Sequence, residues 1–188
     1  MLKQLAEYGK FVEIDGFKKT ELGDPKAFLE AFRKELPEGV EVQLFNADLV
    51  ATWQHLYFAA LNALQAFKNK CNLSKSLAVE TALYASGQRQ IKKAIDLIGL
   101  RPDSANIAAL LIGDDSASVK NGFSAVAAHM GIESDDTVLS FSEAKRKQIR
   151  RIFDVSNEEL EAVTPSLNSE KALVDLIIER VALLSTRL

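Results

Sequence analysis

The stretch VQLFNADLVATWQHLYFAALNALQAF, residues 42–67, decides the fold because it joins a strand pattern to a long helical pattern. Residues 40–45 are rich in β-branched or aromatic side chains and predict a strand. Asn46 and Asp48 follow, and both are residue types that cap helices. In residues 49–67 the apolar side chains keep to one helical stripe, which further apolar side chains widen. The pattern predicts a helix that the rest of the protein encloses on most sides.

The segment 49–67 carries no formal charge and is close to the length of a bilayer span, which takes about 20 residues. It also contains polar side chains, which would be costly in hydrocarbon. We therefore expect a buried helix in a protein that has no membrane partner. The polar residues of the segment are Thr52, Gln54, His55, Asn62 and Gln65.

Further strand and helix patterns lie on both sides of this stretch. Upstream, residues 11–17 predict a strand, and Asp24-Pro25 predicts the start of a helix that ends before Pro37. Downstream, the apolar spacing alternates between helical and strand-like segments. It predicts helices at 77–85 and 89–98, a buried strand at 105–112, a helix through 119–130 and a further strand at 137–141.

The chain from residue 142 onward is expected to be entirely helical. Ser156 and Glu159 have the spacing of a capping box, and a last helix is predicted from about residue 169 to residue 187. An earlier helix places apolar residues under a basic exterior made of Lys145, Arg146, Lys147, Arg150 and Arg151. Without repeats or flexible linkers, residues 1–188 are interpreted as a single α+β domain with a helical C-terminal third.

Composition and charge restrict the class of protein. The 188 residues are 47% hydrophobic and 26% charged, as in an ordinary globular protein. A net charge of -3 argues against a protein whose whole surface coats nucleic acid, although it allows a local basic patch. Cys71 is the single cysteine, which fits a reducing compartment. The N-terminus lacks the features of a signal peptide, so we expect a cytoplasmic location.

No sequence pattern points to a catalytic centre. Neither of the common glycine-rich phosphate-binding motifs occurs, and His55 and His129 lie in different predicted helices without metal-ligand spacing. The aspartate pairs at 114–115 and 135–136 could serve acid–base or Mg²⁺ chemistry, but they stand at element ends, where acidic residues cap helices. We therefore expect no catalytic residue, no metal and no cofactor.

An alternative interpretation is a small enzyme with a pocket beside the long helix. Its candidate residues are His55, Glu80 and Tyr84, of which the last two are spaced i, i+4 on one helical face. Such an enzyme needs the three side chains within hydrogen-bond reach of one cavity. If they pack separately, the protein is better explained as a binding protein.

A local basic patch is the first sequence feature that points to a function other than catalysis. Arg89, Lys92 and Lys93 share one face of the predicted helix 89–98, and Lys75 precedes the neighbouring helix. We interpret these four residues as an RNA-binding patch, in which Arg89 suits base stacking and the lysines suit phosphates. The alternative is an ordinary solvated helix face. The opposite, apolar face of the same helix consists of Ile91, Ala94, Ile95 and Ile98.

The last predicted helix has more apolar circumference than one core usually needs. Either it lies centrally in the core, or it is half exposed for a partner. Its candidate partner-binding residues are Leu173, Ile177, Val181 and Leu184.

An ordered set of residues between 42 and 100 resembles the kinase-binding regulatory subunit of the archaeal and eukaryotic KEOPS complex, the family of human TPRKB. The resemblance implies helices packed on a small, mostly antiparallel sheet, without catalytic activity. The residues that carry it are Phe45-Asn46-Ala47-Asp48, His55 with the alanine-rich helix, Lys75-Ser76, Glu80, Tyr84-Ala85-Ser86-Gly87, Arg89-Gln90-Ile91 and Ala94-Ile95.

Two partners are implied by the same resemblance. One is the small kinase-like ATPase of the complex, which the subunit binds and stimulates. The other is transfer RNA, bound through its single-stranded CCA end in support of the threonylcarbamoyladenosine modification. A further alternative is a purely structural subunit, for which the basic residues between 75 and 93 should be scattered or paired with carboxylates. The basic helix 145–151 is the next candidate for RNA binding.

Overall fold

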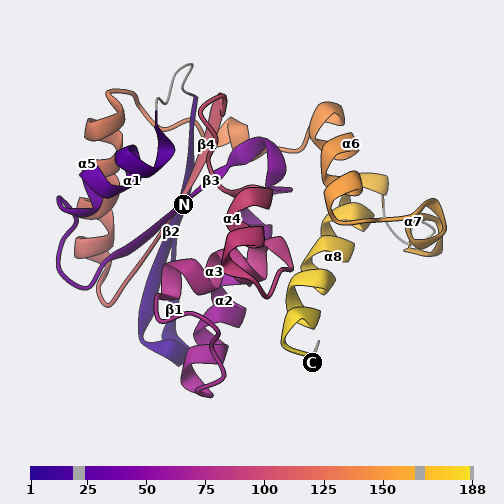
Figure 1. Cartoon of the computed structure of the whole chain (residues 1–188), viewed down its shortest axis with the longest axis horizontal. Coiled ribbons are helices and arrows are strands. Elements are labelled where there is room, and N and C mark those ends of the chain that lie inside the picture. The colour runs from indigo at the N-terminus through magenta and orange to yellow at the C-terminus, as the bar shows by residue number, and fades with distance from the viewer. Residues whose placement is uncertain (19–23, 164–167, 187–188) are drawn as a thin grey trace.

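Four antiparallel strands form one sheet in the computed structural model, which describes residues 1–18, 24–163 and 168–186 (Figure 1). The spatial order is β1-β2-β4-β3, which confirms the predicted α+β class with an antiparallel sheet. The strand bounds are Leu2–Leu5 for β1, Lys10–Lys18 for β2, Glu41–Asn46 for β3 and Asn106–Gly113 for β4. β1 was not predicted from the sequence, because its four residues bury only one apolar side chain.

The central strand β4 is buried on both faces, which explains its continuous apolar sequence. Its neighbours β2 and β3 both pair with it along their length. Successive side chains of a strand point to opposite faces, so β4 contributes to two separate hydrophobic clusters. Ala108, Leu110 and Ile112 belong to one cluster, and Ile107, Ala109 and Leu111 belong to the other.

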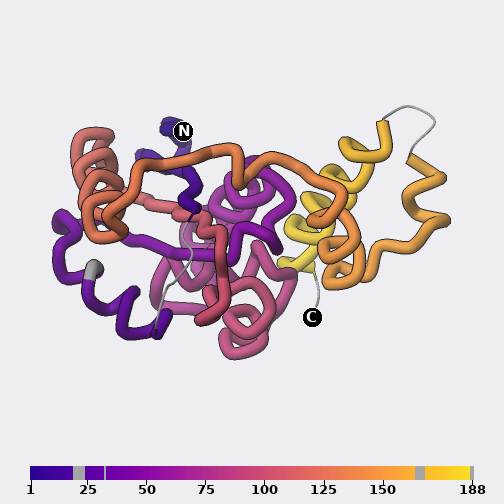
Figure 2. The backbone as a smooth tube through the Cα atoms, turned by 90° about the horizontal axis from the view of Figure 1, so that it is seen from above, coloured from indigo at the N-terminus to yellow at the C-terminus, as the bar shows by residue number. Residues whose placement is uncertain are grey.

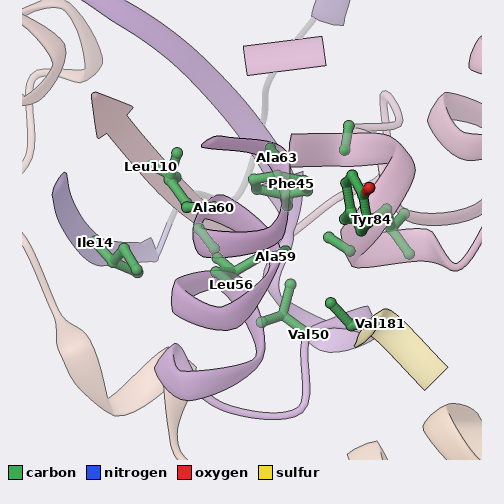
Figure 3. Packing of buried hydrophobic residues seen from close by; sticks show 14 of the residues in the cluster. Ile14, Phe45, Val50, Leu56, Ala59, Ala60, Ala63, Tyr84, Leu110 and Val181 are labelled. Atoms are coloured by element: carbon green, nitrogen blue, oxygen red, sulfur yellow. The ribbon is translucent and has the colours of Figure 1, made fainter. Parts of the chain in front are cut away.

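Helices α2 (Trp53–Lys68), α3 (Leu77–Ser86) and α4 (Ile91–Ile98) cover one face of the sheet (Figure 1). In Figure 3, Leu56 and Ala60 of α2 lie close to Ile14 and Leu110 of the sheet. The small alanine side chains allow α2 to approach both the sheet and α3 closely. The opposite side of the helix carries the exposed Phe58 and Gln65, so α2 is buried along one side and not on most sides as predicted. None of the described helices, α2 included, is long and apolar enough to span a bilayer.

α2 begins later than the sequence predicted. The side chain of Asn46 accepts a hydrogen bond from the backbone N–H of Asp48, and residues Ala47–Leu49 form a short 3₁₀ helix, η2. Two further residues then lead to Thr52, the residue before the first turn of α2. The capping residues therefore belong to η2 and not to the long helix.

Helices α1 (Pro25–Arg33) and α5 (Ser116–Met130) cover the other face of the sheet (Figure 1). α5 begins at its cap Asp115 and ends at Gly131, whose φ of 67° lies in the left-handed region that suits glycine. Their cluster with the sheet includes Phe17, Val42, Leu44, Val119, Val126 and Met130.

The predicted strand at 137–141 is wrong. Residues Asp136–Leu139 form a 3₁₀ helix, η3, which packs on β2 at Gly16. The carbonyl of Gly16 accepts a hydrogen bond of 2.7 Å from the N–H of Asp135, and a Cβ at Gly16 would clash with the side chain of Val138. The β-branched residues of this segment therefore cover the sheet instead of extending it.

The C-terminal third forms a helical layer of α6 (Glu143–Ile152), α7 (Asn157–Val163) and α8 (Ser169–Ala182), followed by the 3₁₀ turn η5 (Leu183–Thr186). Figure 2 shows this layer at the end of the molecule opposite α1 and α5. The capping box of α7 is confirmed, because Ser156 and Glu159 each bond the other's backbone N–H. Residue 187, the predicted helix end, lies outside the described residues.

Candidate nucleic-acid and partner-binding surfaces

His55 is a buried structural residue in the first turn of α2. Its Nδ1 accepts a hydrogen bond from the N–H of Ala51 at 3.3 Å, so the proton lies on Nε2, which donates to the carbonyl of Ala85 at 2.7 Å. Burial, helped by the nearby Lys145, lowers the pKa of His55 to about 4. The edge of its ring also contacts Phe153. The neutral imidazole thus ties α2 to α3 and α6.

Glu80 is also buried, at 1% exposure, and its bonds are separate from those of His55. One carboxylate oxygen accepts hydrogen bonds from the backbone N–H groups of Leu73 (3.0 Å) and Ser74 (2.6 Å), which fixes the loop before α3. Tyr84 lies one turn further along the helix, where burial and the charge of Glu80 raise the pKa of its hydroxyl. Glu80 therefore holds a loop in place.

The three residues do not assemble into one reactive site. His55 bonds the last turn of α3, whereas Glu80 bonds the loop that precedes the same helix. A helix of 10 residues is about 15 Å long, so the two groups act near opposite ends of it. The enzyme alternative built on His55, Glu80 and Tyr84 therefore lacks the convergence that it requires.

The acidic pairs are also used structurally. Asp115 accepts a hydrogen bond from the N–H of Ser118 and caps α5. Asp135 caps η3 through Thr137 and forms an ion pair of 2.7 Å with Lys18. Among the residues that the structure describes, no group of three or more His, Cys, Asp and Glu side chains is arranged to hold a metal ion.

Lys75, Arg89, Lys92 and Lys93 are all exposed, and we call them the α3–α4 basic surface. The three lysines form no ion pair with any carboxylate in the described part of the chain. Lys75 precedes α3 and Arg89 follows it, so the surface extends over about 15 Å.

The arrangement of these residues differs from the prediction in one respect. α4 begins at Ile91 with Gln90 as its N-cap, so Arg89 lies in the connection before the helix and does not share a helical face with Lys92 and Lys93. The three residues Gln88, Arg89 and Gln90 separate the left-handed Gly87 that ends α3 from α4. The side chain of Arg89 is thus positioned by a turn.

The predicted apolar face of α4 is only half buried. Ala94 and Ile98 are buried, but Ile91 is 46% exposed and Ile95 is 37% exposed. α4 packs against α3, and part of the apolar face of α4 extends beyond this contact with α3. Ile95 lines an apolar groove of about 410 Å³, whose other walls include Leu29 of α1, Leu44 of β3 and Leu100.

Lys145 is wrongly assigned to the basic exterior of α6. Its side chain is 6% exposed and its ammonium group donates hydrogen bonds to the carbonyls of Val50 and Val138. Burial lowers the pKa of Lys145 to about 8, although the nearby Asp48 opposes this shift. Lys145 therefore joins α6 to η2 and η3.

The four candidate partner-binding residues, three in α8 and Leu184 in η5, are buried, which corrects the expectation of a half-exposed helix. Leu173, Ile177 and Val181 are fully buried, and Leu184 is 2% exposed. Val181 and Leu184 belong to the cluster that contains α2, and Figure 3 shows Val181 beside Val50. Leu173 and Ile177 belong to a third cluster with α6 and α7.

The exposed surface of α8 is mainly polar. Lys171, Asp175 and Glu179 are exposed along one side of the helix. Leu183, directly after α8, is 41% exposed and is the large apolar side chain that the described C-terminal third presents to solvent. Leu183 could not be distinguished from Leu184 by sequence, because adjacent leucines at the end of a helix differ only in which neighbouring elements cover them.

The sequence profile of a family described as "Kinase binding protein CGI-121" matches residues 26–185, from α1 to η5. The chain belongs to this family. It is also 36% identical to the "Regulatory protein Cgi121" of Methanocaldococcus jannaschii over 117 residues, which cover 62% of this chain and 72% of that protein. These matches confirm the resemblance to the KEOPS regulatory subunit that residues 42–100 indicated.

Proposed function

We propose that the chain is a noncatalytic, cytoplasmic subunit of a KEOPS-type complex, which binds and stimulates a small kinase-like ATPase and binds the CCA end of transfer RNA. In this role it supports the threonylcarbamoyladenosine modification. The family description supports the kinase partner. The observation that carries the RNA part is the α3–α4 basic surface, whose lysines pair with no described carboxylate in a protein of net charge -3.

The composition of this surface suits a single strand. Single-stranded RNA binds through neutralised phosphates and through bases that stack on planar or apolar side chains. Lys75, Lys92 and Lys93 supply cations, and Arg89 adds a planar guanidinium. Ile95, three residues after Lys92 on α4, adds an exposed apolar side chain next to that lysine. A purely structural subunit should have these side chains scattered or paired with carboxylates. Lys75 and Arg89 stand at opposite ends of α3, but the three lysines pair with no carboxylate among the described residues, which favours the binding proposal.

Replacing Lys92 and Lys93 by alanine tests the RNA proposal. Each phosphate contact that is lost from a single strand lowers the slope of log affinity against log salt by about 0.7. The double variant should therefore bind transfer RNA more weakly, with a slope lower by about 1.4. Lys34→Ala with Lys120→Ala is the matched control, because it removes two exposed lysines from the other side of the sheet. Equal slopes for the two double variants would reject the proposal.

The kinase must be bound by exposed side chains, and we propose Leu183 with the polar stripe of α8 as part of that surface. An exposed apolar residue beside charged groups is a common centre of a protein interface. Leu183→Glu should weaken binding of the kinase in a titration and reduce stimulation of its ATPase, while the variant stays folded. Leu73→Glu, at a residue that is 44% exposed before α3, is the control. Unchanged kinase binding by Leu183→Glu would reject this location.

A further inference from the structure

The outer side of α6 carries a second group of basic side chains. Arg146, Lys147, Arg150 and Arg151 are spaced i, i+1, i+4 and i+5, so they follow one side of the helix. Together with Glu143, Asp154 and Val155 they line an open groove of about 590 Å³, which we call the α6 groove. Four cations face two carboxylates there, although the whole chain is acidic.

Two of the four cations are held in place by the protein. Arg150 donates hydrogen bonds to the side-chain oxygen of Asn157 at 2.7 Å and to the carbonyl of Val155 at 3.4 Å. Arg146 pairs with Glu143 at 3.5 Å. By contrast, Lys147 and Arg151 are exposed and form no ion pair with a carboxylate of the described residues. The groove thus combines an ordered wall with two cations that are available to a ligand.

We propose that the α6 groove binds the phosphodiester backbone of a base-paired RNA segment, at a place separate from the α3–α4 basic surface. Three of the four cations are arginines, whose planar fork matches phosphate oxygens. Unlike the α3–α4 basic surface, where Ile95 is exposed near Lys92, the lining offers no exposed large apolar side chain against which an unpaired base could pack. Paired RNA instead presents its phosphates, and it is recognised largely through shape and backbone.

A membrane fits the α6 groove less well. A helix that lies on a membrane inserts exposed apolar side chains between the lipids. The large apolar side chains that are exposed in the described chain come from other segments, and none belongs to α6. The choice of RNA over other polyanions rests on the proposed function, which brings a folded RNA to this protein.

The test uses the variant Lys147→Ala with Arg151→Ala and two probes, a short RNA hairpin and a transfer RNA that lacks its CCA end. Two lost contacts to paired RNA should lower the salt slope by about 1.8 and weaken binding at least about fivefold. Lys34→Ala with Lys120→Ala, which removes the same charge from the opposite side of the sheet, should keep the wild-type slope. Thermal unfolding at the wild-type temperature shows that the α6 variant is folded.

The outcomes separate this proposal from the proposed function. If the α6 variant binds both probes like the control, the α6 groove is rejected, whereas the effect of Lys92 and Lys93 on intact transfer RNA is unaffected by that result. If a polyglutamate peptide or anionic vesicles displace the hairpin as well as unlabelled hairpin does, the groove is a general anion surface and the proposal falls. The proposal is supported if the α6 variant loses hairpin binding and if the polyglutamate peptide and the anionic vesicles both compete only weakly with the hairpin for the wild-type protein.

Discussion

α8 and α4 are both apolar on one side, but they differ in what covers that side. α8 lies between α2 and the pair α6 and α7, so its wide apolar arc is divided between two clusters and closed. α4 packs mainly on α3 and against β3 near Phe45, and it leaves Ile91 and Ile95 partly in water. The width of an apolar face therefore does not show whether the face is exposed, because the number of neighbouring elements decides that.

The largest effect that tests this comparison is expected at two adjacent leucines. Leu184→Glu places a carboxylate in a core position and should cost on the order of 4 kcal/mol or more, a large part of the stability of such a protein. Leu183→Glu changes a surface position and should cost less than about 1 kcal/mol. Urea unfolding of both variants measures the difference. Similar free energies of unfolding for the two variants would contradict the described packing of α8.

A second effect follows from His55, which links the α2 layer to α6. Its pKa of about 4 in the folded protein lies below the ordinary value of 6.5, so the unfolded chain binds more protons between these two values. The free energy of unfolding should therefore fall as the pH is lowered from about 6.5 to 4, by up to about 3 kcal/mol from this residue. Unfolding of the wild type at a series of pH values measures the effect.

The control for this prediction is His55→Gln, which removes the imidazole. The variant should lose part of the pH dependence between 6.5 and 5, above the range where most carboxylates titrate. His129 is unchanged in it, so any contribution of that residue cancels in the difference. Equal pH dependence for the two proteins would show that His55 does not remain neutral in the fold.

The smallest expected effect is on α4. Ile95→Ala removes a side chain that is already 37% exposed, so it should cost less than about 1 kcal/mol. The same substitution at the fully buried Ile177 should cost about 2 to 5 kcal/mol. Parallel urea unfolding checks the pair. A large cost at Ile95 would mean that α4 is covered on more than one side.

Much of the fold can be predicted from local patterns in the sequence. The strands β2, β3 and β4, the long helix α2 and the capping box at Ser156 are visible because each needs only its own apolar spacing or a cap. The short edge strand β1 and the 3₁₀ segment η3 were missed. β1 pairs with β2 and η3 packs against β2, and each segment has only four residues. The order of apolar and polar residues in so short a segment does not indicate such contacts.

The candidate sites show the same limit. The charges of the α3–α4 basic surface were predicted because lysine and arginine are almost always exposed. The exception is Lys145, whose burial depends on two carbonyls from distant segments, Val50 and Val138. The partner surface was placed on the buried side of α8, because the neighbours of a helix cannot be read from its apolar arc.

The central claim is that the α3–α4 basic surface holds the 3′ end of transfer RNA, and one cycle of four binding measurements tests it most directly. Wild type and the Lys92→Ala, Lys93→Ala variant are each titrated with intact transfer RNA and with transfer RNA that lacks CCA. If the lysines contact that end, the mutation and the truncation each weaken binding, and the two together weaken it little more than either alone. Losses that simply add would contradict the claim, because the lysines and the CCA end would then act independently.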